Sequence, residues 1–207
     1  MSVSRPSTHA SHQGRFQVPV LLPQHSRVLF AMWVAQQVSL VWGLTWVWLH
    51  WGPGNPAVPL IVAAWTLTLM PGLLGPVAWL LPPRWCHVAA GERVLHDILG
   101  VGSFERLLEL SGHNRRITPP GAGPITRARL HWRAQTARAG GGAHAACFAI
   151  HLLLAATALL TGHPWGAAGI LLPGVILHLY PVLLQRSIML RLQPLLERYC
   201  LPRAADR

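Results

Sequence analysis

Four long apolar stretches without Asp, Glu, Lys or Arg constrain this chain more than any other feature. They cover residues 28–51, 57–81, 144–160 and 165–184. A helix needs about 20 apolar residues to cross the roughly 30 Å hydrocarbon core of a bilayer, and inside lipid a backbone must satisfy its own polar groups. The sequence therefore predicts an all-α integral membrane protein with four transmembrane helices, arranged as two hairpins.

The positions of the arginines predict the orientation of these helices. All 17 basic residues are Arg: three precede the first stretch, nine lie between the second and the third, and five follow the fourth. Because Arg-rich segments stay on the cytoplasmic side, we expect a multi-pass protein of the cytoplasmic (inner) cell membrane with both termini in the cytoplasm. The expected units are a cytoplasmic N-terminal tail (1–27), a first transmembrane hairpin (28–81), a cytoplasmic or interfacial helical segment (82–143), a second transmembrane hairpin (144–184) and a cytoplasmic C-terminal tail (185–207).

The overall charge and the aromatic residues identify the expected partner. A net charge of +11 would indicate nucleic acid if the chain were soluble. Here the charges flank apolar stretches, and the ten Trp residues favour the interface between lipid and water. Membrane lipid is therefore the expected partner, and nucleic acid is not. The three cysteines lie far apart and match no metal-binding spacing, so no metal site is expected.

The central segment alternates apolar and charged residues. Within residues 94–108 the apolar positions recur at helical spacing. This pattern predicts an amphipathic helix, or two short helices broken near Gly100 and Gly102, lying along the membrane surface. A loop is expected at residues 117–124, followed by a basic helix over residues 126–138 that ends at the next three glycines.

Histidines in the second predicted hairpin indicate a polar site inside the membrane. In an antiparallel pair with a short turn, residues equally far from the turn share a depth. His151 then lies level with His178, and His144 lies level with Gln185 and Arg186. His144 and His151 are seven residues apart, about 10 Å along one helix face. We expect these five residues to converge on one cavity that is open to the cytoplasmic leaflet.

Two interpretations of these polar residues stay open. Ionisable residues inside a membrane are costly, which makes them functional candidates. A neutral His also hydrogen-bonds a neighbouring helix and thereby holds a hairpin together. In the same way, an Arg at a helix end anchors that end to anionic lipid without any further role.

Two glutamines interrupt the first apolar stretch. Gln36 and Gln37 are expected level with Pro71 in the first hairpin. Proline has no N–H, so the carbonyl of Leu67, four residues earlier, lacks its usual helical donor. We expect a glutamine amide to donate to this carbonyl across the helix pair.

A family resemblance begins at His178. Residues 180–186 (Tyr-Pro-Val-Leu-Leu-Gln-Arg), followed by Arg191 and Leu192, resemble the C-terminal signature of the glycosyl-4,4'-diaponeurosporenoate acyltransferases, which is close to Asn-x-x-Pro-x-x-x-Gln-Arg-Tyr-Asn-Arg-x-Arg-Leu. Two upstream segments of the family resemble residues 92–108 and the Gln-Thr-x-Arg-Ala run that precedes His144. The resemblance covers about residues 83–195, in the same order.

The chain departs from this pattern at three places. His178 stands where the family has Asn, Gly141 stands where it has a second Glu, and residues 187–189 are Ser-Ile-Met where it has Tyr-Asn-Arg. The departures leave open a second interpretation, a non-catalytic membrane subunit or scaffold of a lipid-modifying complex. A small transporter is disfavoured because the apolar stretches contain no acidic residue and show no inverted repeat.

The resemblance implies the activity of a membrane-bound acyltransferase. Such an enzyme moves a fatty acyl group from a thioester such as acyl-CoA, as co-substrate, to a hydroxyl of a glycosylated, carotenoid-like lipid; no other cofactor is expected. The hydroxyl needs a general base, usually His, and the phosphates of the donor suit Arg forks. The expected catalytic residues are His144, His151 and His178, with His144 as the base, and the expected substrate-binding residues are Gln185, Arg186, Arg191 and Arg138.

Overall fold

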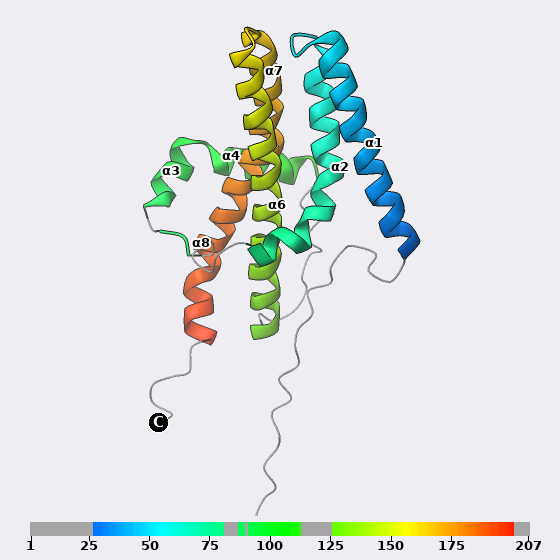
Figure 1. Ribbon diagram of the computed structural model, residues 1–207. Coiled ribbons are helices and arrows are strands. Elements are labelled where there is room, and N and C mark those ends of the chain that lie inside the picture. The colour runs from blue at the N-terminus through cyan, green and yellow to red at the C-terminus, as the bar shows by residue number, and fades with distance from the viewer. Residues whose placement is uncertain (1–26, 81–86, 90, 113–125, 201–207) are drawn as a thin grey trace, which may run out of the picture.

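The computed structural model describes residues 27–80, 87–89, 91–112 and 126–200, and within these ranges it contains helices and no strand. The expected 117–124 loop and nearly all of the expected N-terminal tail lie outside the described residues. The elements are α1 (Arg27–Trp51), α2 (Ala57–Leu80), α3 (Glu92–Ile98), α4 (Val101–Leu110), α6 (Arg127–Leu160), α7 (Pro164–Gly174), the π-helix η2 (Val175–Leu179) and α8 (Tyr180–Cys200) (Figure 1).

Three helices in the described part of the chain are long and apolar enough to cross a membrane. They are residues 57–74 of α2, the whole of α6, and the continuous helix over residues 164–198. Only 28% of each apolar window is buried inside the protein, so most of this apolar surface faces outward and needs an apolar medium. The fold is thus an all-helical one that indicates membrane association. The fourth expected span, residues 28–51, forms α1 but is not among these three helices.

Helix α6 runs without a break through the three glycines at 140–142, where the sequence predicted the end of a basic helix. It begins at the N-cap Thr126, whose hydroxyl accepts from the backbone N–H of Arg129. Gly141 and Gly142 are buried, and α6 packs along α8. Because a residue without a Cβ lets two helices approach closely, packing overrides the low helix propensity of glycine.

The chain from residue 164 to residue 200 is likewise one continuous helical rod, formed by α7, η2 and α8. The expected boundary at residues 184–185 therefore lies inside α8, and the start of the expected C-terminal tail is helical. The predicted break near Gly100 is confirmed: this residue has a φ of +68° between α3 and α4. A left-handed backbone suits glycine and interrupts a helix.

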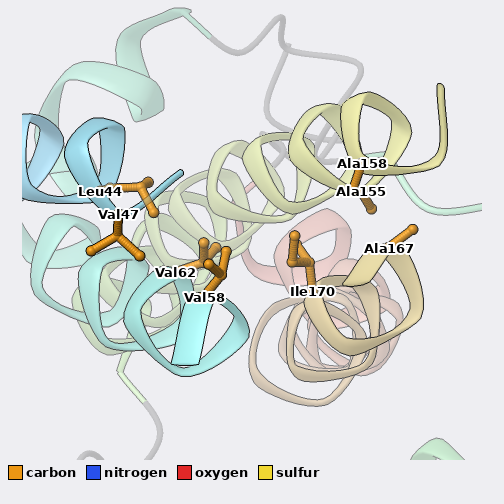
Figure 2. Close-up of a cluster of buried hydrophobic side chains, with 8 residues drawn as sticks. All are labelled: Leu44, Val47, Val58, Val62, Ala155, Ala158, Ala167 and Ile170. Carbon is orange, nitrogen blue, oxygen red and sulfur yellow. The ribbon is translucent and has the colours of Figure 1, made fainter. Parts of the chain in front are cut away.

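A hydrophobic core lies where α1, α2, α6 and α7 meet, near the turns that join them. Figure 2 shows its eight buried side chains, all aliphatic. The contacts of α2 with α6 and α7 bring together residues that are about one hundred positions apart in the sequence. The members are Leu44, Val47, Val58, Val62, Ala155, Ala158, Ala167 and Ile170.

The turn between α1 and α2 lies against the turn between α6 and α7, at the same end of the bundle (Figure 1). Gly166 permits this contact, because a Cβ built on it would lie 2.2 Å from the carbonyl oxygen of Pro53. Asn55 caps α2 by accepting from the backbone N–H of Ala57 at 2.9 Å.

The expected role of the two glutamines is wrong. Gln36 is exposed, and Gln37 is 8% exposed with an amide that has no hydrogen-bond partner. Trp33 occupies the contact with α2 instead, since its ring covers Gly72 so closely that a Cβ there would overlap the ring. A bulky indole packed on a glycine keeps the amide of Gln37 from the Leu67 carbonyl.

We predict that Gly166→Ala lowers the stability of the protein by about 1–3 kcal/mol, because the new methyl group overlaps the backbone at Pro53. The measurement is thermal unfolding of the detergent-solubilised protein. Gly43→Ala in α1 is the control, since a Cβ there meets nothing within 4 Å. An equal melting temperature for Gly166→Ala and wild type would contradict the close contact of the two turns.

Candidate functional site

Three of the predicted site histidines belong to one hydrogen-bonded chain, which also includes Thr66 of α2. Nδ1 of His144 lies 3.2 Å from Nδ1 of His178, and Nε2 of His178 lies 2.9 Å from the Thr66 hydroxyl. The hydroxyl lies 3.1 Å from Nε2 of His151. At the far end, Nδ1 of His151 lies 2.7 Å from the carbonyl oxygen of Ile170. The chain thus joins α2, α6, α7 and η2.

Helix α6 presents two of these histidines on one face. His144 is half-buried and His151 is fully buried. Gly174, at the end of α7, lets the helix containing His178 approach: a Cβ on this glycine would lie 2.6 Å from Cβ of His151. His178 lies between the two histidines of α6 rather than level with His151, since its ring centroid is 5.4 Å from that of either one.

The third histidine projects from a π-turn. In η2 the backbone N–H of Tyr180 donates to the carbonyl of Val175, five residues earlier. Pro181 follows directly and has no N–H for the Leu177 carbonyl, so this stretch does not keep a regular α-helical ladder. Such π-turns inside α-helices occur often at functional sites. His178 is fully buried there.

Gln185 lies beside α6 one turn away from its predicted level. Its amide nitrogen would be 3.6 Å from a Cβ on Gly140, four residues before His144. His144 contacts the ring of His178 instead, with ring centroids 5.4 Å apart. The two layers expected from the sequence are therefore offset. Gly174, which precedes the π-turn, already shows this offset by contacting His151. The turn between Leu160 and Pro164 lies earlier in the chain than a turn that would place His144 level with Gln185.

Arg186 forms a two-point ion pair with Glu92 of α3. Its Nε and Nη2 donate to the two carboxylate oxygens at 2.7 and 2.6 Å. The Arg186 guanidinium holds the pKa of Glu92 below its ordinary value, and the backbone N–H of Ala89 acts in the same direction. The pair fastens α3 to α8.

A second pair and a tyrosine fasten the remainder of this segment. Arg191 donates to both carboxylate oxygens of Glu105 in α4, at 3.0 and 2.6 Å. The hydroxyl of Tyr180 donates to the carbonyl of Leu99 at 3.0 Å. Helices α3 and α4 therefore lie beside α8 as a docked arm, which here means residues 92–110 (Figure 1).

The remaining predicted site residue is Arg138. It is half-buried on α6, six residues before His144. The sequence did not place Thr66, Glu92 or Glu105 among the predicted site residues. A hydroxyl inside an apolar stretch was the one available signal for Thr66, and two acids within an Arg-rich segment were the signal for the carboxylates.

The chain of side chains is suited to proton transfer. Among the described residues, no group of His, Cys, Asp or Glu has the geometry of a metal site. What the histidines offer is an imidazole, half-buried at His144, whose other ring nitrogen is fixed by a hydrogen bond. This is the arrangement of a general base, which needs a proton-accepting nitrogen in a defined orientation.

We predict a pH dependence of the docked arm. A lowered carboxyl pKa stabilises the fold at neutral pH, and this contribution is lost as the pH falls below the ordinary value of 4.5 and through the lowered one. Glu92→Gln should therefore lower the melting temperature at pH 7. The corresponding loss in the free energy of unfolding should be roughly 1–3 kcal/mol. The difference from wild type should shrink as the pH falls below 4.5 and vanish below the lowered pKa of Glu92. A difference that is constant with pH would refute this role of Glu92.

Comparison with known protein families gives a match to most of the C-terminal part of the chain. A family model described as glycosyl-4,4'-diaponeurosporenoate acyltransferase matches residues 76–198. Curated proteins and solved structures gave no match. The matched segment is more than half of the chain and contains His144, His151, His178, Gln185 and Arg186, whereas Thr66 precedes it. The chain belongs to the glycosyl-4,4'-diaponeurosporenoate acyltransferase family.

Proposed function

We propose that this protein is a membrane-bound acyltransferase that esterifies a hydroxyl of a glycosylated, carotenoid-like lipid with a fatty acyl group from a thioester donor. The observation that carries the proposal is the hydrogen-bonded chain of three histidines within the matched family segment. The apolar, outward-facing helices support an acceptor that is dissolved in the bilayer.

The reaction needs one group that first takes and later returns a proton. A ring nitrogen of His144 removes the proton of the acceptor hydroxyl while the hydroxyl oxygen attacks the carbonyl carbon of the thioester. The carbon–sulfur bond then breaks, and the leaving thiolate takes the proton from the imidazolium. The products are an ester and a free thiol. His144 suits this task because it lies at the half-buried end of the chain, whereas His151 and His178 are fully buried.

We propose that the substrate-binding residues serve the same end of the chain of histidines. Gln185 lies against Gly140, near His144, where its amide can hydrogen-bond a sugar hydroxyl. A guanidinium has five N–H donors, and a two-point pair with a carboxylate uses two of them. Arg191, whose side chain is 60% exposed, therefore keeps donors for a phosphate of the acyl donor. Arg138 and Arg186 complete the proposed donor-binding set.

The proposed membrane arrangement has four spans, with α1 as the first and both termini in the cytoplasm. The length of α1, 25 residues, and its exposed Met32, Val38, Trp42 and Leu49 support a lipid contact. The adjacent turns at residues 52–56 and 161–163 carry no Arg, which supports an external position for both. The first hairpin would then be α1–α2, and the second would be α6 with the rod of α7, η2 and α8.

A second candidate function is a non-catalytic subunit or scaffold of a lipid-modifying complex. It is favoured by the ion pairs, since Arg186 and Arg191 already bind carboxylates of the docked arm. Gly141 and residues 187–189, which depart from the family signature, point in the same direction.

We predict that His144→Ala abolishes acyl transfer. Loss of a general base lowers a rate by roughly 100- to 10,000-fold. The measurement compares the lipid profile of membranes that contain wild type or the variant, together with the amount of protein. His50→Ala is the control, since His50 is exposed on α1 and its ring stacks on Trp46.

The outcomes separate the candidate functions. An acylated lipid that disappears while the protein still accumulates identifies His144 as the base. An unchanged lipid profile favours the non-catalytic subunit. A fall in protein abundance equal to the fall in product assigns His144 the purely structural role of joining helices.

We predict that cysteines placed at Asn55 and His163 react with a membrane-impermeant thiol reagent added to intact cells. A cysteine placed at Ser111 should stay unlabelled until the cells are opened. The test uses a protein whose three native cysteines are replaced by Ala. Labelling of the residue-111 variant from outside would overturn the proposed orientation.

A further inference from the structure

Thr66 is the one side chain in the hydrogen-bonded chain that is not a histidine, and it precedes the family segment. It is fully buried in α2. Its hydroxyl lies 3.1 Å from Nε2 of His151 and 2.9 Å from Nε2 of His178, so it bridges the two rings. A hydroxyl has one proton to donate and two lone pairs to accept with. Because it lies between two imidazoles, the hydroxyl fixes the direction in which each hydrogen bond of the chain is donated.

The donors and acceptors can be assigned from the carbonyl of Ile170 onward. A carbonyl oxygen only accepts, so the proton of neutral His151 lies on Nδ1, 2.7 Å away. Nε2 of His151 then carries a lone pair and needs a donor. The hydroxyl of Thr66 also lies 3.1 Å from the carbonyls of Val62 and Ala63, in its own helix. Helix carbonyls have backbone donors, whereas a fully buried Nε2 left without a donor is costly, so the hydroxyl proton goes to His151.

The same logic continues to the half-buried end. With its proton committed to His151, the Thr66 oxygen accepts, and Nε2 of His178 must be the donor. Nδ1 of neutral His178 then carries the lone pair and accepts from Nδ1–H of His144. A neutral imidazole holds one N–H. His144 is thereby left with an unprotonated Nε2.

We propose that Thr66 is a positioning residue that sets the tautomers of His178 and His144, so that Nε2 of His144 is the nitrogen that accepts a proton. This inference rests on the proposed acyl transfer for its catalytic consequence, but the tautomer itself does not depend on that activity. When Nε2 of His144 takes the proton of the acceptor hydroxyl, its Nδ1–H still points to the lone pair of His178. The positive charge that forms is stabilised by that hydrogen bond without any movement of the rings.

The test compares Thr66→Val with Thr66→Ser. Valine has nearly the shape of threonine and no hydroxyl, whereas serine keeps the hydroxyl. In Thr66→Val the Nε2–H of His178 would be buried without an acceptor, so the proton moves to Nδ1 of His178 and His144 takes the opposite tautomer. In Thr66→Val, where the base has the wrong tautomer, we expect the transfer rate to fall roughly tenfold or more. In Thr66→Ser, which keeps the hydroxyl, we expect the rate to stay within about twofold of wild type.

The second measurement reads the tautomers directly. Nitrogen-15 spectra of histidine-labelled protein in lipid, recorded well above the ordinary imidazole pKa of about 6.5, distinguish protonated from unprotonated ring nitrogens. The resonances of His144 are identified by their loss in His144→Ala. We expect a protonated Nδ1 and an unprotonated Nε2 for His144 in wild type and Thr66→Ser, and the reverse in Thr66→Val.

These measurements separate the inference from the proposed function. A wild-type His144 that is protonated at Nε2 overturns the role of Thr66, whatever the activity. Equal transfer rates for Thr66→Val and wild type also overturn it, while a dead His144→Ala would leave the acyltransferase proposal intact. The expected tautomers in a protein without transferase activity would support the role of Thr66 and remove the proposed function.

Discussion

His151 is fully buried in α6, and its Nδ1 lies 2.7 Å from the carbonyl oxygen of Ile170 in α7. A buried imidazole without partners is unfavourable, and here both ring nitrogens have one. The bond is possible because Gly174 has no side chain at the point where α7 crosses His151. From this contact the chain of hydrogen bonds extends to α2 and η2, so the position of each of these elements depends on the burial of one histidine.

The helical nature of the apolar stretches and the proximity of His151 to His178 could be predicted from the sequence, because they follow from the length of the stretches and from a short turn. The continuity of α6 through residues 140–142 could not, since the close packing against α8 decides it and local propensity opposes it. Gln185 lies one turn from its expected level because the turn between Leu160 and Pro164 lies earlier in the chain than the pairing of His144 with Gln185 requires.

The partners of Arg186 and Arg191 also could not be read from the sequence. Glu92 and Glu105 are about ninety residues away along the chain and lie in a segment with many other arginines. Which arginine each carboxylate contacts depends on how the docked arm lies against α8. Thr66 was missed because a hydroxyl in an apolar helix usually bonds to its own backbone, and the Val62 carbonyl also lies within hydrogen-bonding distance of this one. Only the fold brings it between two histidines.

The π-turn at residues 175–179 has a consequence for the phase of the helical rod. One extra residue in a turn rotates everything that follows by about 100° relative to an uninterrupted α-helix. The faces of α8 that carry Gln185, Arg186 and Arg191 are therefore set by this single local distortion. Deleting one residue of η2 would let this turn close as a regular α-helix and keep these faces, whereas a one-residue deletion in the α-helical part of the rod would turn the same amino acids toward different neighbours. For this stretch of the chain, the number of residues is as much a determinant of chemistry as their identity.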